Sequence, residues 1–243
     1  MRTSVPEFLA RRCQVVVLTG AGVSAESGVP TFRGASGLWQ GFRPEELARP
    51  GTFARDPGRV WRWYEWRRRL VARCRPNAAH RALARTEAML PGLRLITQNV
   101  DGLHQEAGSY RVIELHGSLW KVCCTGEGWV REDWRVPLPQ IPPRCECGAL
   151  LRPHVVWFGE TLHPGDLERA LQATHQAELF LVVGTSGVID PAASLPRLAR
   201  GKGAYLVEVN PDATPLTSLA HESHRGPAVE VLPELLGAEQ ERP

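Results

Sequence analysis

Short apolar runs alternate with helix-like segments along most of the chain. Five of these runs have the length and composition of buried strands, and they lie at residues 14–18, 93–97, 111–115, 178–183 and 204–209. Capping and start signals predict helices that open at Ser4, at Asn77 to about residue 90, at Asp166 to about residue 175, and at Asp190. Strands separated by helices predict an α/β fold with a Rossmann-like, doubly wound parallel sheet.

Small or polar residues follow each of the five predicted strands. These clusters lie at residues 19–22, 98–102, 116–118, 184–186 and 210–212. Parallel strands carry their carboxyl ends to one edge of the sheet, and ligands of open α/β sheets bind beyond that edge. The pattern therefore predicts a single ligand site built from five separate turns.

Two segments do not follow the alternation of strands and helices. Residues 30–75 are rich in Arg and Trp, and residues 117–158 hold four of the six cysteines. We expect residues 1–30, 76–116 and 159–243 to form the Rossmann-like domain. Residues 31–75 and 117–158 are expected to form a smaller module, with a helical part and a cysteine-containing part that resembles a zinc ribbon.

Composition narrows the class of protein further. Of 243 residues, 43% are apolar and 23% are charged, as in ordinary globular proteins, and a net charge of +3 gives little reason to expect nucleic-acid binding. No apolar run approaches the ~18–20 residues that cross a bilayer, and the N-terminus lacks the apolar core of a signal peptide. We expect a cytoplasmic monomer without membrane or nucleic-acid partners, whose cysteines are thiols or metal ligands.

A glycine-rich turn follows the first strand. Gly20, Gly22 and Ala25 form the pattern G-x-G-x-x-A, which suits either a pyrophosphate-binding turn or a plain tight turn. Gly28 and Pro30 should stop the next helix after about one turn, and a long loop follows. This arrangement argues against an ordinary dehydrogenase and favours a lid over a cofactor.

Five motifs appear in a fixed order along the chain. They are Gly-Ala-Gly-Val-Ser-Ala-Glu-Ser-Gly at 20–28 with Thr-Phe-Arg at 31–33, Thr-Gln-Asn-Val-Asp at 97–101, His-Gly at 116–117, Gly-Thr-Ser at 184–186 and Asn-Pro at 210–211. Together they resemble the motifs of the sirtuin family, over about residues 14 to 231. The resemblance implies an NAD-consuming protein-lysine deacylase, in which the acyl oxygen attacks C1′ of the nicotinamide ribose and displaces nicotinamide.

The resemblance also implies roles for the strand-end residues. His116 would be the general base on a ribose hydroxyl, Asn99 would orient ribose and water, and Asp101 would hold the nicotinamide carboxamide. Taken alone, each of these residues could be structural, for example in an Asx turn. The cofactor-binding residues that the resemblance implies are Gly20, Ala21, Gly22, Ser24, Ala25, Phe32, Arg33, Trp39, Gln98, Asn99, Val100, Asp101, Gly184, Thr185, Ser186, Asn210, Pro211, Asp212 and Ala228.

A basic, aromatic helix is expected over residues 59–75, with seven arginines. Most of them suit a solvated face, and a nucleic-acid patch is disfavoured because the rest of the chain is not basic. Tyr64 and Arg67 share one helix face and could bind a carboxylate. This pair, with Ala25 and Gly159, resembles the class III sirtuins, which prefer succinyl, malonyl or glutaryl lysine.

We therefore expect a desuccinylase or demalonylase with weaker deacetylase activity. A plain deacetylase or mono-ADP-ribosyltransferase on the same scaffold stays an alternative, as do a hydride-transferring oxidoreductase and a non-catalytic NAD-sensing module. Segments 155–160 and 187–192 would flank an acyl-lysine peptide bound as an added strand. The substrate-binding residues expected are Tyr64, Arg67, Val156, Phe158, Gly159 and Val188.

The cysteine pattern is a degraded form of the structural zinc site that the resemblance implies. The family has two Cys-x-x-Cys pairs, whereas this chain has Cys124 with Glu127 at the second position, followed by Cys145 and Cys147. Either Glu127 or Cys123 could supply the fourth zinc ligand. A metal-free module packed on tryptophans is the alternative.

Overall fold

A six-stranded parallel sheet forms the larger part of the computed structural model, which describes residues 4–31 and 44–237. Its strands lie in the order β3-β2-β1-β7-β8-β9. The strand bounds are β1 Val15–Thr19, β2 Arg94–Thr97, β3 Val112–Glu114, β7 Leu179–Val183, β8 Tyr205–Val209 and β9 Glu222–His224. Every residue of β1 and β7 is buried, as continuous apolar strands in the middle of a parallel sheet require.

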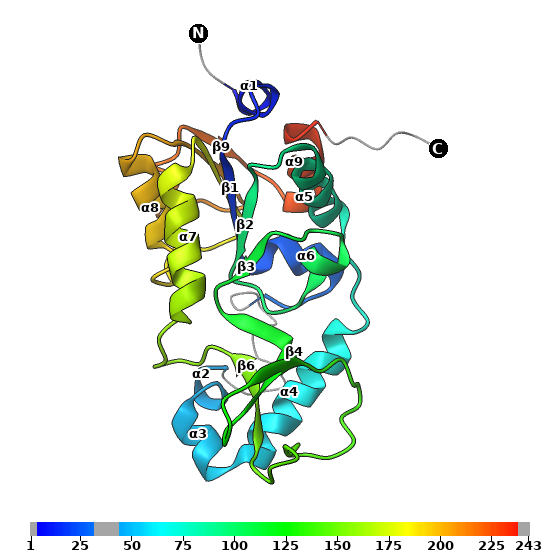
Figure 1. The fold of residues 1–243 in the computed structure, drawn as a ribbon. Coiled ribbons are helices and arrows are strands. Elements are labelled where there is room, and N and C mark those ends of the chain that lie inside the picture. The colour runs from blue at the N-terminus through cyan, green and yellow to red at the C-terminus, as the bar shows by residue number, and fades with distance from the viewer. Residues whose placement is uncertain (1–3, 32–43, 238–243) are drawn as a thin grey trace.

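Helices cover both faces of this sheet (Figure 1). Helices α5 and α9 pack on one face, and α7 and α8 pack on the other. The remaining helices of this part are α1 before the first strand, the 3-10 helix η1 after it, and the short α6. Their bounds are α1 Val5–Ala10, η1 Ala21–Ser27, α5 Ala78–Met89, α6 Leu103–Glu106, α7 Pro164–Gln176, α8 Ser194–Gly201 and α9 Ala228–Leu235. The predicted doubly wound α/β fold is confirmed.

Two of the four predicted helix starts agree with the structure, and two do not. Ser4 opens α1 through a capping box, and the Asn77 side chain accepts hydrogen bonds from the amides of Ala79 and His80, as the sequence predicts. Asp166 does not cap α7, because this helix already begins at Pro164 and places Asp166 in its first turn. Helix α8 begins four residues after Asp190, whose carboxylate accepts the Ser194 hydroxyl (2.6 Å).

A second, smaller sheet lies beside helices α2, α3 and α4 in the lower part of Figure 1. This sheet is antiparallel with the order β5-β4-β6. The bounds are α2 Pro44–Leu47, α3 Pro50–Arg55, α4 Pro57–Val71, β4 Gly117–Cys124, β5 Val130–Glu132 and β6 Leu151–Val155. Helix and sheet share one hydrophobic core, in which the Trp61 indole donates to the Leu151 carbonyl (2.7 Å).

The arginines of α4 and the residues after it divide into two groups. Five are exposed, which fits the solvated face expected of the basic helix: Arg59, Arg62, Arg69, Arg73 and Arg75. Arg67 and Arg68 are instead buried. Arg68 pairs with Asp133 (3.4 Å) and donates to the Asp133 and Arg135 carbonyls. In the described part of the chain, no helix is long and apolar enough to span a membrane.

Candidate functional site

The turns after β1 and β7 touch through their backbones. The Gly22 amide donates to the Gly184 carbonyl (2.8 Å), and the Gly20 amide donates to the Val183 carbonyl (3.0 Å). A Cβ atom on Gly22 would lie 2.8 Å from the Gly184 Cα atom. Gly184 itself has a φ of +59°. Two strand ends therefore meet with no side chain between them, and the Gly20 and Gly22 amides are both used in this contact.

The helix after the first turn is short, as expected. It is a 3-10 helix of seven residues that ends at Gly28 in the left-handed conformation. The predicted stop at Gly28 is confirmed, although the helix is somewhat longer than the one turn expected. The segment expected to form a lid, including Phe32, Arg33 and Trp39, lies outside the described residues.

A buried polar group lies under the glycine turn. The Ser24 hydroxyl donates to the Asp101 carboxylate (2.8 Å), and the Asn99 amide nitrogen donates to the Gly20 carbonyl (3.1 Å) and to Ser24 Oγ (3.2 Å). Burial raises the pKa of Asp101, and hydrogen bonds from the Leu103 amide and Ser24 oppose this rise. The bond to Leu103 is of the Asx type, so Asp101 forms the local turn and also faces the site.

His116 lies at the end of β3 with one ring nitrogen fixed. Its Nδ1 atom is 2.9 Å from the Gln98 carbonyl oxygen. Because a carbonyl can only accept, Nδ1 carries the proton and Nε2 keeps its lone pair, which is the form a general base needs. Burial lowers the pKa of His116, and the bond to Gln98 partly opposes that shift.

Side-chain contacts link the remaining strand ends. The Gln98 amide nitrogen donates to Thr185 Oγ1 (2.9 Å), and the Asn210 amide nitrogen donates to the Thr185 carbonyl (2.8 Å). With the bond from His116 to Gln98, these contacts join the ends of β2, β3, β7 and β8. The five clusters predicted from the sequence thus lie at one edge of the sheet.

The other predicted cofactor residues lie around this edge with fewer side-chain contacts. Ala21, Ala25, Val100 and Ser186 are half-buried, and Pro211 and Asp212 are exposed after β8. Ala228 is buried at the first position of α9. Thus most of these residues are accessible at the rim, whereas Ala228 is covered.

Tyr64 and Arg67 are both buried, at 1% and 4% exposure. The Trp157 indole nitrogen donates to the Tyr64 hydroxyl oxygen (2.9 Å). The Arg67 guanidinium lies 4.9 Å from the Trp63 ring centroid and 5.4 Å from that of Tyr64. Burial lowers the pKa of Arg67, and the interactions with Tyr64, including a hydrogen bond, and the charge of Asp101 oppose this shift.

Exposed apolar side chains mark the two segments expected to flank a peptide. Phe158 is 40% exposed and Val188 is 41% exposed. The Val156 amide donates to the His116 carbonyl (3.0 Å), which ties the first segment to the candidate base. Gly159 follows with a φ of +91°. The first segment therefore adjoins His116 through its backbone.

Two buried histidines were not singled out from the sequence. His80 Nε2 lies 3.3 Å from Ser24 Oγ, and its Nδ1 lies 3.0 Å from Asn77 Oδ1. His104 Nε2 lies 3.0 Å from Thr19 Oγ1, and the two imidazole centroids are 4.8 Å apart. Both lie on helices, α5 and α6, and no sequence pattern indicated that the fold would place them beneath the strand ends.

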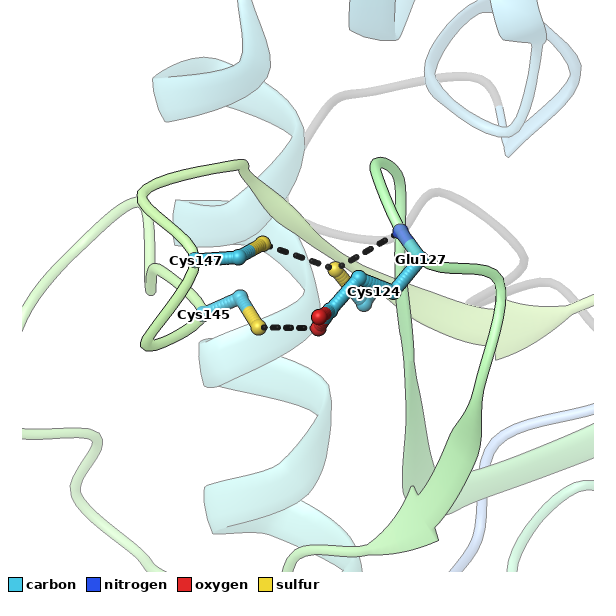
Figure 2. Close-up of side chains that lie close together, drawn as sticks. All are labelled: Cys124, Glu127, Cys145 and Cys147. Carbon is cyan, nitrogen blue, oxygen red and sulfur yellow. Dashed lines mark hydrogen bonds between the residues drawn. The ribbon is translucent and has the colours of Figure 1, made fainter.

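The cysteine module gathers four side chains into one group (Figure 2). The three Sγ atoms and one carboxylate oxygen of Cys124, Glu127, Cys145 and Cys147 lie within 4.8 Å of one another. Cys124 and Cys147 are 3.6 Å apart at sulfur, and Cys145 Sγ is 3.4 Å from Glu127 Oε2. A tetrahedral zinc site with bonds of about 2.3 Å has ligand separations of about 3.8 Å, so the group fits zinc.

The fourth position of this group belongs to Glu127 and not to Cys123. The Cys123 thiol instead contacts the carbonyls of Cys124 (3.6 Å) and Gly128 (3.8 Å). Adjacent residues of a strand point to opposite faces, so Cys123 and Cys124 cannot both face the group. The Glu127 carboxylate also accepts the Trp129 indole N–H (2.8 Å), which orients it toward Cys145.

Comparisons with known proteins agree with this geometry. The family model described as the Sir2 family matches residues 20–191. The NAD-dependent protein deacylase of Aquifex aeolicus is 57% identical over 207 residues, covering 85% of this chain and 87% of the relative. The NAD-dependent protein deacylase 1 of Archaeoglobus fulgidus is 52% identical over 94% of both chains.

Solved structures agree as well. A Sir2 homologue in complex with NAD superposes with a TM-score of 0.88 at 50% identity, covering 96% of this chain and 93% of that one. A Sir2 structure with 2′-O-acetyl-ADP-ribose and a deacetylated peptide gives a TM-score of 0.82 at 32% identity, covering 96% of each chain. The chain belongs to the Sir2 family.

Proposed function

We propose that this chain is an NAD-dependent protein-lysine deacylase that prefers succinyl and malonyl lysine over acetyl lysine. The observation that carries the proposal is the contact of His116 with Gln98 beside the buried group of Ser24, Asn99 and Asp101. It is supported by relatives named NAD-dependent protein deacylases at 52–57% identity.

Different residues at the carboxyl ends of the strands would bind different parts of NAD. The glycine turn, which has no bulky side chains, would let the pyrophosphate approach closely, and Thr185, Ser186 and Asn210 would contact the adenosine half. The Asp101 carboxylate would accept from the nicotinamide carboxamide, which needs an acceptor for its N–H groups. When bound, NAD supplies an electrophilic ribose carbon and a leaving nicotinamide.

His116 would take a proton from a ribose hydroxyl through Nε2. The Gln98 carbonyl holds the ring in the required tautomer. Burial favours the neutral ring, so the base is ready at neutral pH. Asn99 would orient the ribose and a water molecule, since its amide group both donates and accepts.

The acyl preference rests on Tyr64 and Arg67. A buried guanidinium among aromatic rings favours an anionic group that can accept two hydrogen bonds, as the distal carboxylate of a succinyl group does. The Trp157 N–H occupies a lone pair of the Tyr64 oxygen, which leaves the Tyr64 hydroxyl hydrogen to donate toward a ligand. A neutral acetyl group offers neither residue an anionic partner.

The acyl-lysine peptide would bind between residues 155–160 and 187–192, with Val156, Phe158, Gly159 and Val188 in contact. Backbone pairing reads little sequence, so the acyl group would dominate specificity. A structural zinc ion would be held by Cys124, Glu127, Cys145 and Cys147, remote from the reaction. We further propose a monomer divided into the two parts given above.

A side-by-side panel of acyl peptides with NAD tests the proposal. Matched succinyl, malonyl and acetyl peptides are incubated with NAD, and peptide mass and free nicotinamide are followed. We expect the acidic acyl groups to be removed at least ~10-fold faster, the size of one lost charged hydrogen bond. A faster acetyl reaction contradicts the acyl preference, and formation of NADH contradicts the deacylase itself.

Arg67→Met separates the acyl pocket from the rest of the site. The variant keeps a long apolar stem but loses the charge, so desuccinylation should fall by ~10-fold or more while deacetylation stays within about twofold. Arg62→Met, on the exposed side of α4, is the matched control. Equal losses on both peptides contradict the role given to Arg67.

A further inference from the structure

A carboxylate lies almost fully buried near the end of strand β8. Glu208 is 1% exposed, between the apolar neighbours Val207 and Val209. Its oxygens accept from the hydroxyls of Thr214, Thr217 (2.6 Å) and Ser223 (3.5 Å). Burying a charge is costly unless it is paired and hydrogen-bonded. The three hydroxyl donors offset part of this cost at Glu208.

Arg225 completes the group from the far side. Its Nη1 atom donates to Glu208 Oε2 (3.0 Å) and to the carbonyl of Asp212 (3.1 Å), with a longer contact to that of Asn210 (3.4 Å). Its Nη2 atom donates to Thr217 Oγ1 (3.0 Å). The ion pair therefore ties both the start and the end of the loop at residues 210–217 to strand β8.

This loop carries one of the contacts of the candidate site. The Asn210 amide nitrogen donates to the Thr185 carbonyl (2.8 Å), and Thr185 Oγ1 accepts from Gln98. Acidic residues that bind a ribose in Rossmann-like folds must be exposed at the strand end. Glu208 is buried and its oxygens bind the loop, so its position excludes direct ribose binding.

We infer that Glu208 and Arg225 are positioning residues that hold residues 210–217 in the shape required by the adenosine half of NAD. The inference rests on the proposed function, because it takes this loop as part of the NAD site. The ion pair acts through the loop and touches neither the reacting ribose nor the acyl group. Its loss should therefore weaken NAD binding without changing turnover at saturation.

Kinetics of single variants test this positioning role. Glu208→Gln keeps the shape of the side chain but loses its charge, and Arg225→Met keeps the stem of the arginine. In each we expect the KM for NAD to rise ~5- to 10-fold, with kcat at saturating NAD and the KM for the acyl peptide within twofold. Glu222→Gln, on the neighbouring edge strand, is the control and should leave all three constants unchanged.

The double variant and a stability measurement complete the test. Because the two residues form one unit, Glu208→Gln with Arg225→Met should raise the KM no further than about the larger single effect. An unchanged KM for NAD together with a lowered Tm reduces the pair to a purely structural role and overturns the inference. A fall in kcat without a change in KM overturns it too, whereas a parent protein that cleaves no NAD overturns the proposed function along with it.

Discussion

Single residues at this site act through the direction of their hydrogen bonds. A carbonyl oxygen at Gln98 determines which nitrogen of His116 is protonated, and an indole N–H at Trp157 determines which way the Tyr64 hydroxyl can donate. Neither partner reacts in the proposed chemistry. Both restrict a residue that can otherwise donate or accept to one orientation, which is how a rigid scaffold prepares a reactive group.

The pH dependence of kcat/KM should follow the neutral form of His116. Burial lowers its pKa below the ordinary 6.5, and protonation of Nε2 removes the lone pair that would take the ribose proton. We expect activity to decline toward acid pH, with the half-maximal point below 6.5. A half-maximal point above pH 7 would contradict the assignment of His116 as the base.

Trp157→Phe should weaken acyl selectivity without abolishing activity. The change removes the N–H that binds the Tyr64 hydroxyl, and one such buried bond contributes about 1 kcal/mol, or ~5-fold. The ratio of desuccinylation to deacetylation should fall by that factor. Trp134→Phe, an exposed indole that bonds Glu132, is the control. An unchanged ratio rules out a positioning role for Trp157.

Elements differ in how far the sequence predicts them. Strands β1 and β7 could be predicted as continuous apolar runs, and β2, β3 and β8 as short, mostly apolar runs between helix signals. Parallel pairing then determined which turns share an edge. Strand β9 was missed because Glu222, Ser223 and His224 are polar and pair only at the sheet border. The contacts of Trp157 with Tyr64 and of Arg225 with Glu208 were also missed, since they join distant residues and leave no local pattern.

The zinc affinity of the cysteine module should depend on Glu127. Three thiolates and one carboxylate bind zinc less tightly than four thiolates, because thiolate is the softer ligand. We expect Glu127→Ala to weaken zinc binding at least ~10-fold and Glu127→Cys to strengthen it, as measured by competition with a chromophoric chelator. Cys123→Ser is the control, and its side chain lies outside the group. If Cys123→Ser loses zinc and Glu127→Ala does not, the ligand set is wrong.

At the scale of the whole molecule, His80 and His104 are buried histidines with lowered pKa values that lie beneath the edge of the main sheet. Burial lowers the pKa of His80 to about 4 and that of His104 well below 6.5. These two residues therefore bind more protons in the unfolded chain than in the folded one between about pH 6.5 and pH 4, so their contribution makes stability rise with pH across this window. Below pH 6.5, protonation of His80 and His104 should therefore destabilise the part of the fold that carries the candidate site.

Unfolding in urea at several pH values checks this linkage. Between pH 7.5 and pH 5, His80 alone should lower the free energy of unfolding by ~2 kcal/mol, and His104 should add to this. His80→Gln should flatten the dependence, whatever its effect on stability at pH 7.5. His175→Gln, exposed near the end of α7, should keep the parental slope. The same slope in His80→Gln as in the parent rejects the linkage.

Backbone contact between Gly22 and Gly184 has a consequence for how this enzyme can vary. Each position already holds the smallest residue, and a methyl group at either one would lie within 3 Å of the other's main chain. No second substitution can relieve that overlap, because nothing smaller exists to replace the partner. Selection for altered cofactor use must therefore keep both glycines and work through the side chains around them.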